Sequence, residues 1–217
     1  MLALFSLPKS RKEIYQTMKI RKKRAVPEEV DCRYCTEYIR SVGCTALKCP
    51  YIKERIEAGM IGYEELIANT FSFCPNLYRR LQTAIKYFPG TLWADDGHES
   101  RFLYATAGSY DIFLKPRYYA AVYLLTADED LYRRCSCCFM RSGVYFRNIR
   151  IQRISTFGYT LYSYAKKLYS GKTDLPIGEL IDEETIPEEA FTLIVNAAMI
   201  AKFGTDIFNI TKTTTET

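Results

Sequence analysis

Four cysteines near the N-terminus have the residue type and the spacing of a metal site. They form the pattern Cys-x2-Cys-x8-Cys-x4-Cys, at Cys32, Cys35, Cys44 and Cys49. Two close pairs of thiolates joined by a short loop supply the four ligands that tetrahedral zinc takes in a closed, structural site. We therefore expect a structural Zn2+ on these four sulfurs. The spacing leaves two alternatives open, an iron–sulfur cluster and a set of reduced thiols.

The other thiols lie further along the chain, at Cys74, Cys135, Cys137 and Cys138. Together with the only histidine, His98, they could complete a second metal site. Two adjacent cysteines cannot easily ligate one tetrahedral ion, and free cysteine is among the most buried residue types. The pattern therefore favours small buried side chains over a second metal.

One short run, WADDGHES, combines carboxylates with the histidine, at Asp95, Asp96, His98 and Glu99. Such residues can hold a divalent cation for phosphoryl chemistry, as in a nuclease, but they also make an ordinary solvated turn. Any histidine-activated nucleophile would have to be built around His98. The chain contains no phosphate-loop motif, no G-x-G-x-x-G and no H-E-x-x-H. We expect a protein that is not an enzyme.

A block without acids is the stronger functional signal. Residues 131–173 contain nine basic and no acidic residues, interleaved with aromatic ones. Guanidinium groups bind phosphates and exposed rings stack on unpaired bases, so we expect binding to nucleic acid or a nucleoprotein. The alternative is that the aromatic rings are core and the arginines pair with the acidic stretch 174–189. The candidate residues are Arg133, Arg134, Arg141, Arg147, Arg150, Arg153, Lys166 and Lys167, together with Arg21, Lys22, Lys23 and Arg24 in a basic N-terminal leader.

The acidic stretch 174–189 has seven acids and no base. A partner with a basic channel could bind it in place of nucleic acid, which makes an inhibitor of a host defence nuclease the second functional hypothesis. The competing interpretation is that its carboxylates cap helix N-termini, as Glu188 and Glu189 would after Pro187. The residues concerned are Asp182, Glu183, Glu184, Glu188 and Glu189.

Apolar spacing predicts a mainly α protein. A small zinc-stapled helical N-terminal domain is followed by a helical C-terminal domain with at most a short β-hairpin. The residues Arg147, Arg150 and Arg153 share a face if their segment is helical, and they fall on both sides if it is extended. The helices are expected at 27 to about 41, 51–59, 63–71, 75–88, from Pro116 onwards, at 154–168 and at 187–204.

The predicted organisation is a basic leader (1–26), a zinc-binding helical domain (27–92), a helical domain (93–208) and a tail (209–217). Nearly half of the residues are apolar, so the chain is expected to be globular. The N-terminal apolar run is too short for a signal peptide, and no stretch is long enough to cross a membrane. We therefore expect a cytoplasmic, reducing environment, in which cysteine pairs more often bind metal than form disulfides.

Residues 32–66, with their ERIEAG and YEEL motifs, resemble small cysteine-rich proteins of Gram-positive conjugative and other mobile elements. The runs 118–134, 157–171 and 190–204 are similar to an uncharacterised helical domain of the same elements, from which CSCC departs. The resemblance implies no catalytic residues. It implies a protein that travels with mobile DNA and that regulates or handles it, or one that blunts host defence, as anti-CRISPR inhibitors do on Cas nuclease–guide RNA complexes.

Elemental analysis of the purified chain tests the metal prediction directly. We expect one bound zinc ion per chain, because four thiolates complete a closed tetrahedral site. A protein purified without any bound transition metal would contradict this expectation.

Overall fold

A computed structural model describes the backbone of residues 38–39 and 43–44, and residues 51–57, 59, 61–71, 74–107, 116–140, 142–171 and 177–210. The protein is mainly α, as predicted from the sequence. The helices are α2 (Ile52–Glu57), α3 (Tyr63–Phe71), α4 (Tyr78–Lys86), α5 (His98–Thr106), α6 (Pro116–Ala127), α7 (Glu129–Cys135), α8 (Thr156–Tyr169), α9 (Ile177–Ile181) and α10 (Glu188–Phe203).

Short elements accompany these helices. The described residues form two antiparallel hairpins, β1 (Tyr38–Ile39) with β2 (Gly43–Cys44), and β3 (Phe139–Met140) with β4 (Gly143–Val144). The second is the short hairpin expected in the C-terminal part. The 3-10 turns are η3 (Pro75–Leu77), η4 (Ser136–Cys138), η5 (Phe146–Asn148) and η6 (Thr205–Asn209).

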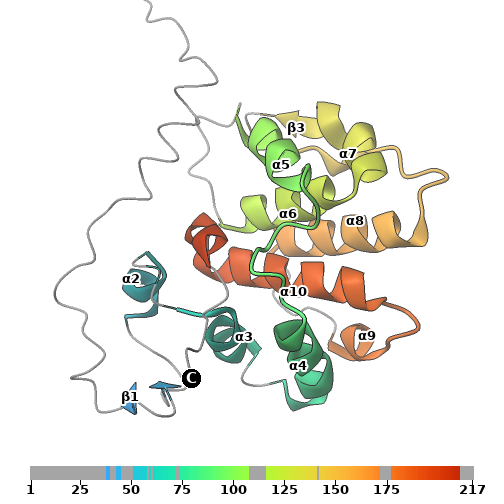
Figure 1. Cartoon of the computed structure of the whole chain (residues 1–217). Helices are drawn as coiled ribbons and strands as arrows, with labels where there is room; N and C mark the ends of the chain where they lie inside the picture. The colour runs from blue at the N-terminus through green and yellow to red at the C-terminus, as the bar shows by residue number, and fades with distance from the viewer. Residues whose placement is uncertain are drawn as a thin grey trace, which may run out of the picture.

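Helix α10 crosses the middle of the molecule (Figure 1). Helices α6 and α8 lie on one side of it, and α3 and α4 lie on the other. The spacing of Phe191, Ile194 and Ala198 predicts a single apolar face on this helix, but nearly all side chains from Ala190 to Ile200 are buried. A helix that is apolar all round belongs in the interior, surrounded by other helices. The predicted apolar face is therefore only part of the helix surface that other helices cover.

Helix α6 is the second interior helix. Its residues from Ala120 to Ala127 are all buried. The small side chains of Ala120 and Ala121 are fully enclosed, and small residues let helix backbones approach closely. Helix α8, which packs against α6, is amphipathic as predicted, with Leu161 and Ala165 buried.

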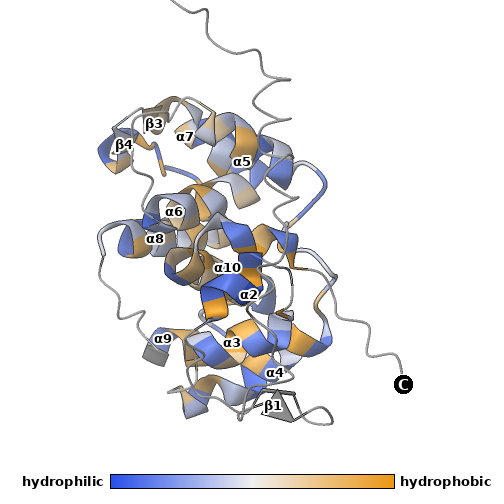
Figure 2. Cartoon of the chain, turned by 90° about the vertical axis from the view of Figure 1, so that its left-hand side faces the viewer, coloured by the Kyte–Doolittle hydropathy of each residue, from blue (hydrophilic) through white to orange (hydrophobic). Residues whose placement is uncertain are grey.

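The helices before residue 92 share this core. Tyr63 of α3 stacks on Phe88, with ring centroids 3.9 Å apart, and both belong to the same apolar cluster as the residues of α6 and α10. Apolar and polar residues alternate around α3 and α4, so each can turn one side to the core (Figure 2). The described residues on both sides of position 92 thus pack together, and the predicted domain division stays a prediction.

A buried polar network runs through this apolar core. The Oδ1 of Asn196 on α10 accepts a hydrogen bond from the Tyr63 hydroxyl at 2.8 Å, and its Nδ2 donates to the Tyr123 hydroxyl at 3.2 Å. Tyr123 in turn donates to the carbonyl of Leu92. Burial raises the pKa of Tyr63 and of Tyr123, so both hydroxyls stay protonated and can donate. The network joins α3, α6, α10 and the segment before α5.

Arg80 joins α4 to the connection between α9 and α10. Its guanidinium donates to the carbonyls of Leu180 at 2.8 Å and Ile186 at 2.7 Å, and it pairs with Glu188 at 3.0 Å. The same group lies 4.1 Å from the ring centroid of Phe191. A buried cation is tolerated when it is paired and hydrogen-bonded in this way.

One local prediction is wrong and one helix is missing from the predictions. The helix expected from 27 to about 41 cannot extend that far, because Tyr38 and Ile39 are extended and pair with Cys44 and Gly43. The run WADDGHES contains the expected turn, but α5, which is not predicted from the sequence, begins at His98 within it. The apolar pattern of α5 is too short to predict a helix from the sequence. Its apolar residues become part of the core because the helix packs against α6.

Replacing Asn196 with alanine tests the polar network. We expect Asn196→Ala to lower the free energy of unfolding by about 2 kcal/mol, because the buried Tyr63 and Tyr123 hydroxyls each lose a partner. Chemical denaturation measures this change. Asn148→Ala, at an exposed position of η5, serves as the control and should alter stability by less than about 0.5 kcal/mol. Equal effects of the two substitutions would contradict the role given to Asn196.

Candidate nucleic-acid interface

Several predicted site residues lie outside the described part of the chain. The predicted zinc ligands Cys32, Cys35 and Cys49 are among them, and of Cys44 the structure describes only the backbone, at the end of β2. The zinc site therefore stays a prediction. The described residues contain no group of three or more histidine, cysteine or acidic side chains that could hold a metal ion. The candidate cations outside the described ranges are Arg21, Lys22, Lys23, Arg24 and Arg141.

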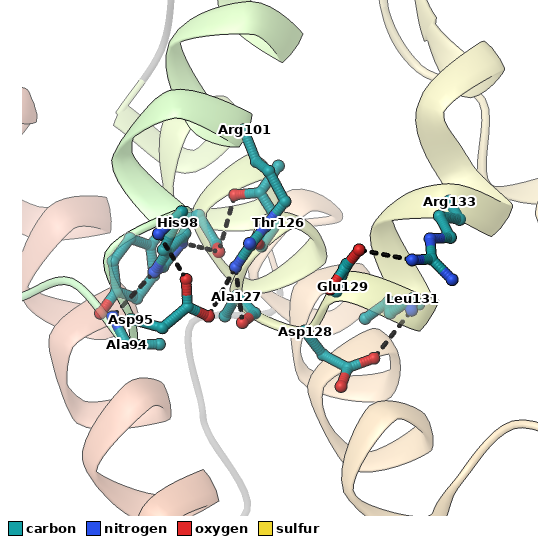
Figure 3. Close-up of polar contacts among 12 residues, drawn as sticks. Ala94, Asp95, His98, Arg101, Thr126, Ala127, Asp128, Glu129, Leu131 and Arg133 are labelled. Atoms are coloured by element: carbon teal, nitrogen blue, oxygen red, sulfur yellow. Dashed lines mark hydrogen bonds and ion pairs between the residues drawn. The ribbon is translucent and has the colours of Figure 1, made fainter.

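Both ring nitrogens of His98 are hydrogen-bonded to the protein backbone (Figure 3). Its Nδ1 accepts a hydrogen bond from the backbone N–H of Ala94 at 3.0 Å, so the ring proton is on Nε2, which donates to the carbonyl of Tyr123 at 2.9 Å. The side chain is fully buried, and burial lowers its pKa to about 4. Both nitrogens are thus occupied in a neutral ring, which leaves neither for a metal or for proton transfer.

The carboxylate beside His98 is also engaged. Asp95 accepts a hydrogen bond from the N–H of Gly97 at 2.7 Å and pairs with Arg101 at 2.7 Å. Although partial burial opposes the change, these contacts lower the pKa of Asp95. Arg101 reaches the C-terminal carbonyls of α6, at 2.7 Å from that of Thr126 (Figure 3). The run WADDGHES therefore anchors α5 to the end of α6.

Part of the basic block is neutralised by nearby acids. Arg133 pairs with Glu129, and Arg134 pairs with Asp130 at 2.9 Å, each one helical turn away on α7. This i,i+4 spacing is readable in the sequence, although the acids lie just outside the acid-free block. Lys167 is the one predicted cation with a described partner in the acidic stretch 174–189, since it pairs with Glu179 at 2.8 Å.

Four predicted cations are exposed and have no carboxylate partner among the described residues. Arg147 lies in η5, Arg150 and Arg153 lie in the segment between η5 and α8, and Lys166 lies on α8 itself. The three arginines would share one face only on a continuous helix, and this condition is not met, because η5 ends at Asn148 and the chain continues without helix to Ser155. With two exposed rings they form what we call the basic surface: Arg147, Arg150, Arg153, Lys166, Tyr145 and Tyr159.

The aromatic residues of the block divide between core and surface. Tyr162 and Tyr164 are buried, whereas about half of the surface of Tyr145 and of Tyr159 is exposed, 48% and 52% respectively. The ring of Phe146 packs against Tyr162, with centroids 5.9 Å apart, and so holds the coil of the basic surface against α8. On α8 itself, Tyr159 and Lys166 are seven residues apart, and this spacing places them on one helix face.

Half of the described acids in the stretch 174–189 have partners within the protein. Glu188 pairs with Arg80, and Glu179 accepts hydrogen bonds from Lys167 and from the Tyr164 hydroxyl. Asp182 accepts hydrogen bonds from the Thr185 hydroxyl and the Glu184 N–H, which lower its pKa. Glu188 and Glu189 occupy the first turn of α10 directly after Pro187, as the capping interpretation predicts.

Comparison with protein-family models, curated proteins and solved structures finds no match to this chain. Within the described residues, no helix combines the length and the apolar character needed to cross a membrane.

The buried His98 predicts a specific pH dependence of stability. Its pKa falls from 6.5 to about 4 on folding, so between these values the unfolded chain binds a proton that the folded chain does not. Its contribution to stability is complete above pH 6.5 and is lost as the pH falls, by roughly 3 kcal/mol at pH 4.

Denaturation of the wild type and of His98→Gln between pH 7 and pH 4 measures this contribution. Since His98 is the only histidine, the difference between the two pH profiles isolates it from the carboxylates. We expect the variant to lose less stability on acidification. Parallel profiles would show that His98 is not the group responsible.

Proposed function

We propose that the protein binds nucleic acid through the basic surface, without catalysing a reaction. The supporting observation is the contrast between two sets of cations. Arg133, Arg134 and Lys167 have acidic partners, whereas Arg147, Arg150 and Arg153 are exposed and have none among the described residues. Unneutralised cations produce a positive potential that attracts phosphates.

Backbone contacts dominate this binding. Guanidinium groups bind phosphate oxygens through two parallel hydrogen bonds, and each such contact releases a counterion and makes affinity depend on salt. The exposed rings of Tyr145 and Tyr159 offer stacking faces to unpaired bases. The basic leader, Arg21 to Arg24, supplies further phosphate contacts. The resemblance to mobile-element proteins agrees with a role in handling that DNA.

The alternative, an inhibitor that docks on a defence nuclease by its acids, has less support. Of the five candidate carboxylates, Glu188 neutralises Arg80 and Asp182 is held in its own turn. The acids that are exposed without such contacts, Glu183, Glu184 and Glu189, are too few to imitate a run of phosphates. The described structure therefore favours the basic surface.

Neutralising the three coil arginines tests the proposal. For the triple variant Arg147→Ala, Arg150→Ala and Arg153→Ala, we expect weaker binding to fluorescent DNA and RNA oligonucleotides. The dependence of log affinity on log salt should become shallower by roughly 3, about 1 for each phosphate contact removed. Fluorescence anisotropy across a salt series measures both effects.

A charge-matched control separates the basic surface from net charge. Lys53→Ala, Arg79→Ala and Lys86→Ala remove the same charge from exposed positions of α2 and α4. This control should bind nearly as tightly as the wild type. Equal losses in the two triple variants would reduce the interaction to overall charge, and undetectable wild-type binding at low salt would refute the proposal.

A further inference from the structure

Two neighbouring thiols directly follow α7 and are not part of the predicted zinc motif. Cys137 and Cys138 are in η4, and their sulfur atoms are 3.8 Å apart. Cys137 is exposed and Cys138 is buried. The nearby Cys135 is also buried, and its thiol donates to the carbonyls of Leu125 and Tyr132. One thiol of the adjacent pair is therefore open to reagents, and its neighbour is close enough to react with it.

We propose that Cys137 and Cys138 are a redox modification site, at which a small-molecule disulfide such as glutathione disulfide converts the two thiols into a reversible vicinal disulfide. The Cys137 thiolate attacks one sulfur of glutathione disulfide, and one glutathione thiolate leaves. Cys138 then loses its proton and attacks the Cys137 sulfur, which expels the second glutathione. The two cysteines are oxidised, and one glutathione disulfide is reduced to two thiols.

The environment of each thiol determines the order of these steps. Cys137 reacts first because it is the exposed member of the pair. Burial, reinforced by the neighbouring Cys137, raises the pKa of Cys138 to about 11, so Cys138 remains a protonated thiol until the mixed disulfide forms beside it. Burial also raises the pKa of Cys135, which keeps that thiol out of the exchange.

A disulfide between adjacent residues is easily reduced. Consecutive Cα atoms are about 3.8 Å apart, whereas disulfides usually join Cα atoms about 4.4–6.8 Å apart. The bond would therefore be strained, and strained disulfides are the labile and regulatory ones. A bond of this kind suits a reducing compartment, in which disulfides are transient and report on oxidation.

The pair is connected to the basic surface through the backbone. The carbonyl of Cys138 accepts a hydrogen bond from the N–H of Tyr145 at 3.0 Å, across the hairpin of β3 and β4. Closing the disulfide ring strains the Cys137–Cys138 peptide group, directly before the carbonyl that Tyr145 bonds, and so acts on Tyr145 and the turn that carries Arg147. This consequence rests on the proposed function, whereas the modification itself does not.

Peptide mapping of the intact protein tests the modification. The protein is incubated with glutathione disulfide, its free thiols are alkylated, and it is digested with trypsin without reduction. Cleavage after Arg134 and Arg141 releases the peptide CSCCFMR, which holds all three thiols. We expect this peptide to lose two hydrogen atoms and to carry one alkyl group, on Cys135. Dithiothreitol should restore three alkylated thiols.

Two variants identify the bonded pair. Cys137→Ser changes an exposed side chain and should give two alkylated thiols with no loss of hydrogen. Cys138→Ala should stop the reaction at the mixed disulfide, with glutathione on Cys137. A wild-type peptide with three alkylated thiols, or with glutathione retained on Cys137, would overturn the proposal. So would a Cys138→Ala peptide that still loses two hydrogens, since Cys135 would then be the partner.

Discussion

The hydrogen bonds of Asn196 are the interaction on which the arrangement of the helices depends. Helix α10 is buried on nearly every side, and a polar residue at its centre is tolerated only where its neighbours provide partners. Tyr63, Tyr123 and Leu92 provide them, from α3, from α6 and from the segment before α5. Apolar contacts would allow α10 to slide or rotate at small cost, whereas the amide has one geometry that satisfies all its partners. The network therefore determines the register of the core.

Burial and local ion pairs determine which residues of the basic block 131–173 remain available at the surface. Tyr162 and Tyr164 are buried and cannot stack on a base, and Arg133 and Arg134 each pair with an acid one turn away on α7. The buried Arg80 likewise pairs with Glu188, so this acid is not free to bind a partner. Of the remaining cations, three lie on η5 and the segment after it, where Phe146 packs against Tyr162 of α8, and Lys166 lies on α8 itself. A sequence with a moderate net charge of +5 thus presents a local positive surface.

Burial separates the reactive side chains that stabilise the fold from those that can react with small molecules. His98 and Cys135 are buried and donate hydrogen bonds to backbone carbonyls, so they stabilise the fold. Cys137 is exposed beside a buried thiol, and that difference is what makes the pair suited to exchange. A buried, hydrogen-bonded thiol is unreactive toward disulfides, whereas an exposed thiol beside a second thiol can form one.

The sequence by itself determined the helical class and most helix positions, because apolar spacing, proline and glycine act locally. Helices α3, α6 and α10 begin and end close to where these signals predict. The spacing of Cys32 and Cys35 likewise predicts metal binding without reference to the fold. Only the tertiary structure decided that α10 is enclosed all round, that His98 is neutral and that Arg147 lacks the acid that Arg133 has. Those properties depend on contacts between residues far apart in the chain, and neither composition nor periodicity specifies which distant residues meet.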